Sequence, residues 1–252
     1  MRVAQVANSD SPRILVGCSG WHYEDWRGRL YPQNLGKTRW LTHYSSTFET
    51  VELNNTFYRL PSQTSVSRWY DATGGNFIFA VKGSRYITHV RRLVDVAAPI
   101  QEFTEQVSGL GSKMGPVLWQ LPPQLSRNDA LLDAFLNILP TETRNVIEFR
   151  HATWWNDRTY AMLREHQTAI CLVDMPGFKS PPIATTDFIY VRFHGAGQLY
   201  SSCYETEQLS RWATDISQLG KGVHTVYAYF NNDVNGYAVD NALTLRGLLT
   251  AH

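Results

Sequence analysis

Eight short apolar runs recur along the chain at intervals of about 31 residues, and each ends in polar or ionisable residues. Segments with helical periodicity separate most of them. Near-continuous apolar strands that alternate with amphipathic helices indicate parallel strands buried on both faces, and eight such units predict an α/β fold, a (β/α)8 TIM barrel. The runs are Ile14 to Gly20, Thr50 to Tyr58, Phe77 to Gly83, Pro116 to Pro122, Asn145 to His151, Thr168 to Met175, Phe188 to Gly195 and Thr225 to Asn232.

One helix of the repeating pattern is missing. The stretch from Met175 to Asp187 contains Pro176, Gly177, Pro181 and Pro182, so a Pro-rich loop is expected between strands six and seven. We expect one barrel domain over residues 1–252, with residues 1–12 as an N-terminal extension. The helices are predicted at 35–46, 63–71, 98–110, 129–139, 157–166, 207–219 and 238–249.

Composition narrows the class of partner. Lys and Arg total 23 against 22 Asp and Glu, a net charge of +1, which excludes the strongly basic balance typical of non-specific duplex binding. A nucleic-acid partner would therefore need a local basic patch. Three cysteines without a C-x-x-C spacing and the lack of a long apolar stretch predict a cytoplasmic protein without a membrane partner. The oligomeric state is left open.

Polar side chains gather where the strands end. Active sites of TIM barrels lie at the C-terminal ends of the strands, and residues two apart on one strand face the same way. So many polar groups are not expected in a purely structural core, because burying each ion without a partner or a ligand costs several kcal/mol. The expected site therefore combines Glu52, Asn54, Lys82, Gln120, Glu148, Arg150, Asp174, Arg192, His194, Asn231 and Asn232, with Trp21 and Tyr200 from the long loops as stacking residues.

Residue types suggest roles within this set. Three cations, two of them guanidinium forks, favour an anionic small molecule that carries a carboxylate or phosphate, bound by Lys82, Arg150 and Arg192. An ionised carboxylate can act as a base, and a histidine that titrates near neutral pH can act as an acid. The expected catalytic residues are Glu52, Glu148, Asp174 and His194.

A divalent metal is the competing interpretation. Glu148, Asp174 and His194 are the types expected of an oxygen and imidazole site, but Arg150 and Lys82 would repel a cation. The sequence therefore favours a site without metal. No nucleotide cofactor is indicated, because the glycines of 109–113 and 195–200 lack the spacing of a phosphate-binding loop or a dinucleotide fingerprint.

The same residues carry a resemblance to a known family. The chain resembles the YecE-like family of TIM barrels, the domain of unknown function 72, although Cys18, His22 and Asn55 differ from the family pattern. The resemblance implies the barrel and no particular activity. The matching stretches are Gly17 to Trp21, Val51 to Tyr58, Phe79 to Lys82, Trp119 to Pro123, Glu148 to His151, Tyr190 to Gly195 and Tyr229 to Asp233.

Together the residues predict an enzyme, a hydrolase, lyase or isomerase, acting on a phosphorylated or otherwise anionic small molecule or nucleotide at the C-terminal rim. Two alternatives stay open. One is a non-catalytic protein that binds a ligand or nucleic acid. The other is a metal-dependent enzyme related in chemistry to phosphoesterases or endonucleases.

Overall fold

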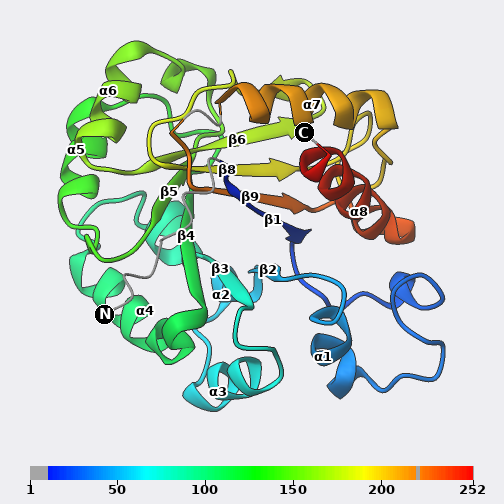
Figure 1. The fold of residues 1–252 in the computed structure, drawn as a ribbon. Coiled ribbons are helices and arrows are strands. Elements are labelled where there is room, and N and C mark those ends of the chain that lie inside the picture. Colours follow the sequence, from blue (N-terminus) through cyan, green and yellow to red (C-terminus); the bar gives the residue numbers. More distant parts are fainter. Residues whose placement is uncertain (1–10, 220–221, 252) are drawn as a thin grey trace, which may run out of the picture.

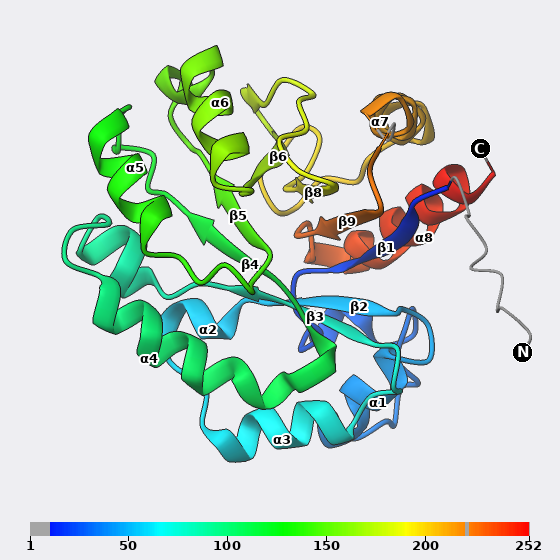
Figure 2. The same ribbon diagram turned by 60° about the vertical axis from the view of Figure 1, so that its left-hand side comes forward.

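Eight parallel strands form the barrel in a computed structural model that describes residues 11–219 and 222–251. The strands neighbour one another in the order β1-β9-β8-β6-β5-β4-β3-β2, and helices lie outside them (Figures 1 and 2). The predicted TIM barrel is confirmed. Its strands are β1 (Arg13–Cys18), β2 (Thr50–Leu53), β3 (Ile78–Lys82), β4 (Met114–Gln120), β5 (Asn145–Glu148), β6 (Ala169–Met175), β8 (Phe188–Phe193) and β9 (Thr225–Phe230).

The first and last strands of this order, β1 and β2, meet through a side chain. The Tyr44 hydroxyl accepts a hydrogen bond from the Cys18 amide at 2.9 Å and donates one to the Thr50 carbonyl at 2.9 Å. Gly17 leaves room for this hydroxyl, since a Cβ there would lie 2.8 Å from it and 2.3 Å from the Thr50 oxygen. One direct bridge, between Ser19 and Glu52, pairs the two strands beyond that point.

Helices cover the outside of the barrel (Figure 2). Several begin where a side chain caps them: Ser62, Asn128 and Asn156 each accept a hydrogen bond from a backbone N–H in the first turn. Their apolar faces pack against the outward side chains of the strands in a continuous core. The helices are α1 (Trp40–Tyr44), α2 (Asn55–Tyr58), α3 (Gln63–Asp71), α4 (Ala97–Val107), α5 (Asp129–Asn137), α6 (Asp157–Glu165), α7 (Thr206–Leu219) and α8 (Tyr237–Thr250).

The connection after β6 agrees with the predicted order of elements, whereas the end of β2 differs from it. The connection from β6 to β8 contains no helix, as expected; instead Phe178–Lys179 forms β7, a short antiparallel partner of β6. The second strand is shorter than predicted, because residues 55–58 turn into α2, where the Thr56 hydroxyl bonds the Leu53 carbonyl at 2.9 Å. The first ten residues of the expected N-terminal extension lie outside the described residues.

A second apolar cluster fills the inside of the barrel. Its members alternate along the strands with the outward ones, as a period of two requires. Aromatic rings of β8 and β9, Tyr190, Tyr227 and Tyr229, dominate it, and Ala80 and Leu118 face them from β3 and β4. Above this layer the interior becomes charged. In the described part of the chain, no helix is long and apolar enough to cross a membrane.

Candidate active site at the C-terminal rim

A buried arginine joins two strands' carboxylates at the top of the barrel. Arg192 of β8 donates from Nη2 to Glu52 Oε1 at 2.8 Å and from Nη1 to Glu148 Oε2 at 2.7 Å. All three side chains are shielded from solvent. Because an unpaired buried charge is costly, each of these groups depends on the other two.

Paired charges set the protonation states of this cluster. Burial alone would raise the pKa of Glu148, but the positive charges of Arg150 and Arg192 hold it well below its usual value. Burial would lower the pKa of Arg192, and the carboxylates of Glu52 and Glu148 raise it instead. The Arg192 guanidinium and the Glu148 carboxylate therefore stay charged at neutral pH.

His194 is neutral in this setting. Burial, together with the charges of Arg192 and Arg150, lowers its pKa well below the usual value. Arg150 binds Glu148 through Nε and places Nη2 3.0 Å from His194 Nε2. A guanidinium only donates, so Nε2 is the acceptor and the proton of neutral His194 lies on Nδ1. The nitrogen of the Asn231 amide lies 3.3 Å from Nδ1, and the amide must turn its oxygen toward the ring to accept that proton. The expectation that His194 titrates near neutral pH is wrong.

Lys82 has a different environment. Its Nζ lies 4.2 Å from the centre of the Phe57 ring and makes no ion pair or hydrogen bond to any residue that the structure describes. Burial and the nearby Arg192 lower the pKa of Lys82 to about 8. The amine is thus the one cation of this group that no carboxylate neutralises, counting only described residues.

A second set of polar groups lies beside Glu52. Ser19 donates its hydroxyl to Glu52 Oε1 at 2.6 Å, and Tyr23 donates to the Ser19 carbonyl at 2.6 Å. The Asp233 Oδ1 atom is buried and has no partner among the described residues. Burial raises the pKa of Asp233 to about 8; the nearby Tyr23 hydroxyl lowers it, and the charge of Glu52 raises it further. Asp233 therefore holds a proton at neutral pH.

Trp21 and Asn54 line a small hollow next to these groups. It has a volume of about 200 Å³ and is bounded by Gly20, Trp21, His22, Tyr23, Asn54 and Asn55. Trp21 is buried and packs edge-on against Trp69, so its ring supports the wall. The Asn54 Oδ1 atom is buried without a partner in the described structure and is a candidate ligand contact.

Asp174 does not belong to the site. It lies level with Phe193 in the pairing of β6 with β8, and both point away from the barrel interior. Its Oδ2 accepts a hydrogen bond from the Trp212 indole of α7. Strand alternation explains the error, because Val173 faces the interior cluster and its neighbour must face outward. The predicted metal set Glu148, Asp174 and His194 is therefore divided between two faces.

Three other predicted residues sit at the edge of the site. Asn232 is buried and donates to the Ser202 carbonyl and to Asn241 of α8, both at 2.9 Å, so it fixes a loop rather than facing the site. Tyr200 is 42% exposed, and its ring lies edge-on to His194 with centroids 5.6 Å apart. Gln120 is half-buried at the end of β4, level with Glu148 of β5.

Three residues of the network were not predicted: Ser19, Asp233 and Tyr190, which donates to Glu52 Oε2 at 2.6 Å. Two of them carry a signal in the sequence. Tyr190 precedes Arg192 by two positions and so shares its face of β8, and Ser19, directly after β1, follows Gly17 by two positions in the same way. Asp233 lies in a loop beyond β9, where alternation gives no guidance.

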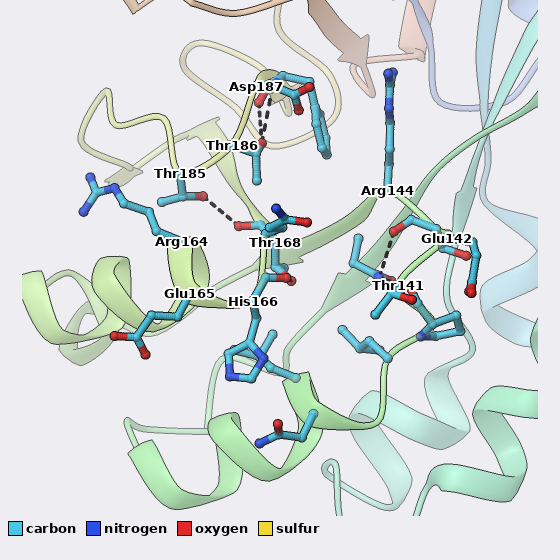
Figure 3. A pocket seen from close by; sticks show the side chains of 18 residues that line it. Thr141, Glu142, Arg144, Arg164, Glu165, His166, Thr168, Thr185, Thr186 and Asp187 are labelled. Carbon is cyan, nitrogen blue, oxygen red and sulfur yellow. Dashed lines mark hydrogen bonds between the residues drawn. The ribbon is translucent and has the colours of Figure 1, made fainter.

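A larger hollow lies at the opposite end of the barrel (Figure 3). It has a volume of about 660 Å³ and is bordered by connections that precede β5, β6 and β8. Its charged groups are exposed or paired: Arg144 donates to Tyr227 at 2.7 Å, and His166 lies 3.2 Å from Asp133. This end of a TIM barrel serves stability rather than catalysis, so the candidate site remains at the C-terminal rim.

Comparisons with known proteins agree with this architecture. The model of the family described as protein of unknown function DUF72 matches residues 15–252. YunF of Bacillus subtilis is 24% identical over 270 residues, with 94% of each chain covered. YecE of Escherichia coli K12 is 32% identical over 139 residues, which cover 55% of this chain and 48% of YecE.

Solved structures give the same result. A DUF72 family protein from Thermotoga maritima superposes with a TM-score of 0.87 at 32% identity, covering 94% of this chain and 99% of that one. A DUF72 family protein from Enterococcus faecalis superposes with a TM-score of 0.82 at 22% identity, covering 94% and 95%.

Proposed function

The chain belongs to the DUF72 family of proteins of unknown function, and from the charges in its barrel mouth we propose that it is an enzyme acting on an anionic small molecule. The ligand would bind at the C-terminal rim, above the layer of interior aromatic rings. Its anionic group, a carboxylate or a phosphate, would complete the charge balance of the site. The reaction would be a hydrolysis, an elimination or an isomerisation driven by proton transfer.

One observation carries the proposal: the mouth has more positive than negative charge. Glu52 and Glu148 are matched by Arg192 and Arg150, and Lys82 is left without a carboxylate among the described residues. Protonated Asp233 adds no negative charge near neutral pH. A half-buried excess cation favours an anionic ligand, because the ligand then supplies the missing partner.

Arg150 offers a place for that anion. Among the residues that the structure describes, its Nη1 donates only to the thioether of Met175, 2.8 Å away, and sulfur of this kind is a weak acceptor. An anionic ligand oxygen in place of the Met175 sulfur would form a stronger hydrogen bond with Arg150 Nη1. Arg192, which we expected to hold the ligand, uses both terminal nitrogens on carboxylates and is better placed to position Glu52 and Glu148.

Proton transfer is assigned to Asp233 rather than to His194. A catalytic acid works best when its pKa lies near the working pH, and the pKa of Asp233 is about 8. Neutral His194 can accept a hydrogen bond but holds no proton to donate at Nε2. Glu148, held ionised by two guanidinium groups, is a weak base.

Ligand-dependent stabilisation tests this proposal. Phosphate or sulfate should raise the melting temperature of the protein more than chloride does at equal ionic strength, because a ligand that binds only the folded state stabilises it by mass action. The Lys82→Met variant should lose that increment. Arg144→Met is the matched control, since it removes a cation at the opposite hollow (Figure 3).

The two variants separate the possible outcomes. Retention of the full response in Lys82→Met together with its loss in Arg144→Met would place the anion at the wrong end of the barrel. A response equal to that of chloride in the wild type would refute anion binding altogether. Circular dichroism of each variant checks that the fold is intact.

A second candidate, binding of single-stranded nucleic acid, has one specific observation in its favour. Tyr58 and Tyr86 are 74% and 49% exposed on the connections after β2 and β3. Arg59, Arg85 and Arg92 are exposed on the same connections. Aromatic rings among arginines suit stacking on bases and contact with phosphates. A salt titration of binding to a fluorescent oligonucleotide would decide, since binding with a steep salt dependence is expected.

A further inference from the structure

In the described part of the chain, the buried Lys113 and the half-buried Lys82 are in opposite chemical situations. Lys113, near the base of α3, donates from Nζ to the Tyr70 carbonyl at 2.5 Å, to the Thr73 carbonyl at 2.9 Å and to the Thr73 hydroxyl at 3.2 Å. Its ammonium is fully satisfied. Lys82 makes no such bond to a described residue and lies in the barrel mouth. The difference points to a function for the free amine.

We propose that Lys82 is a nucleophile that forms a Schiff base with the carbonyl group of an anionic substrate. The inference rests on the proposed function and adds the substrate class: an aldehyde or ketone that also carries a carboxylate or phosphate. A covalent step at this amine would make the site that of a lyase or an isomerase working through an imine.

The geometry around Lys82 suits a nucleophile. The residue ends β3, and its carbonyl accepts a hydrogen bond from the Thr56 hydroxyl at 2.6 Å, which fixes the start of the side chain. The amine stands over the Phe57 ring, whose face attracts an ammonium group weakly but provides no oxygen or nitrogen acceptor for its hydrogens. After burial, the Arg192 guanidinium is the largest influence on this amine and disfavours a third positive charge, whereas the Glu148 and Glu52 carboxylates act in the opposite direction.

These surroundings leave part of the amine unprotonated. Burial and the charge of Arg192 lower the pKa of Lys82 to about 8. At pH 7.5 the neutral fraction is then on the order of a hundredfold larger than that of an exposed lysine. Since only the neutral amine has a free electron pair, Lys82 should react far ahead of the surface lysines.

The step balances without a further reagent. The neutral amine adds its electron pair to the carbonyl carbon, so a C–N bond forms and the carbonyl oxygen takes a proton. Loss of that oxygen as water removes both hydrogens of the amine and leaves a C=N bond. Protonation gives an iminium ion, which withdraws electrons from the adjacent C–H or C–C bond. The anionic group of the same substrate would contact Arg150.

Reductive trapping tests the proposal. The full-length protein is incubated at pH 7.5 with pyruvate, a ketone next to a carboxylate, and cyanoborohydride, which reduces the imine to a stable secondary amine. Peptide mass mapping should locate the adduct on Lys82, at least tenfold above its level on exposed Lys37 or Lys179, a margin allowed by the difference in neutral fraction. Lys113 is the internal control and should remain unmodified.

Two further arms make the outcome decisive. Acetone, a ketone without the anion, should label Lys82 less than pyruvate does, and added phosphate should protect it. Lys82→Arg keeps the positive charge but cannot form an imine, so it should lose the adduct and keep the response to phosphate. If the wild type shows that response and pyruvate labels Lys82 no more than Lys37, the nucleophile is refuted and the anion site stands.

Discussion

Arg192 and Glu52 form an ion pair across the inside of the barrel, with Nη2 2.8 Å from Oε1 and the two side chains 1% and 0% exposed. The pair joins β8 to β2, which are not neighbours in the sheet. The contact therefore ties opposite walls of the barrel, and Glu148 extends it to β5. Stability and site geometry depend on the same guanidinium.

Replacing Arg192 by Met should be strongly destabilising. Glu52 and Glu148 would lose their shared cation while buried, and breaking such a pair costs about 3–5 kcal/mol. Urea unfolding followed by circular dichroism gives the difference in free energy. Arg13→Met is the control, because the Arg13–Glu49 pair is 46% and 70% exposed and should contribute under about 1 kcal/mol. Similar losses in both variants would contradict the buried network.

Two interior tyrosines provide a matched comparison. Tyr190 donates to the Glu52 carboxylate at 2.6 Å, whereas Tyr229 shares a hydrogen bond of 2.6 Å with the neutral Thr50 hydroxyl. Hydrogen bonds to charged groups are worth about 1.5–3 kcal/mol and neutral ones about 1 kcal/mol. Tyr190→Phe should thus lower the free energy of unfolding more than Tyr229→Phe does. The reverse order would show that Glu52 does not depend on Tyr190.

Stability should fall with pH because of Asp233. Its folded-state pKa of about 8 lies above that of an unfolded aspartate, so between these values the folded protein binds more protons and rising pH favours unfolding. The slope is at most about 1.4 kcal/mol per pH unit. Asp233→Asn should remove it.

The best window for this measurement is pH 6.5 to 7.5. The lowered pKa of His194 gives the opposite slope, mainly below the usual histidine value and decreasing across the window, and that of Glu148 acts at still lower pH. The lowered pKa of Lys82 makes stability rise with pH mainly above 8. Melting temperatures of wild type and Asp233→Asn that change in parallel across the window would exclude a raised pKa at Asp233.

Asp174→Asn should leave anion binding intact. Its carboxylate contacts Trp212 on the outside of β6, so the variant should keep the full stabilisation by phosphate. Weakening a charged hydrogen bond that is partly buried should cost about 1–2 kcal/mol of unfolding free energy. If a folded Asp174→Asn protein lost its stabilisation by phosphate, Asp174 would have to be counted as a residue of the binding site.

The repeating apolar runs were sufficient to predict the barrel, because a parallel strand buried on both faces is a near-continuous run of apolar residues in the sequence. They also located the missing helix after β6 through its prolines. The end of β2 was misread because residues 55–58 are as apolar as the strand before them. Periodicity does not distinguish a short buried helix from a strand extension.

Strand alternation placed Glu148 with Arg150 and Arg192 with His194, and the structure brings these four together. Asp174 was added to the predicted site without a partner two positions away to fix its face of β6, and alternation with the interior Val173 places it outside. The protonation states of these residues could not be predicted from the sequence. The neutral form of His194 and the protonated form of Asp233 result from burial and from partners on other strands.

The Tyr44 hydroxyl between Cys18 and Thr50 stands where β1 and β2 would otherwise exchange backbone hydrogen bonds. Just beyond these two residues, the only direct bridge across this gap in the described chain joins Ser19 to Glu52, the acceptor of Arg192. The residue that completes the ring of strands is therefore the same one that holds Arg192 in the charged network. A variant that separates β1 from β2 should displace Glu52 from Arg192, so closure of the barrel and ligand affinity should be lost together.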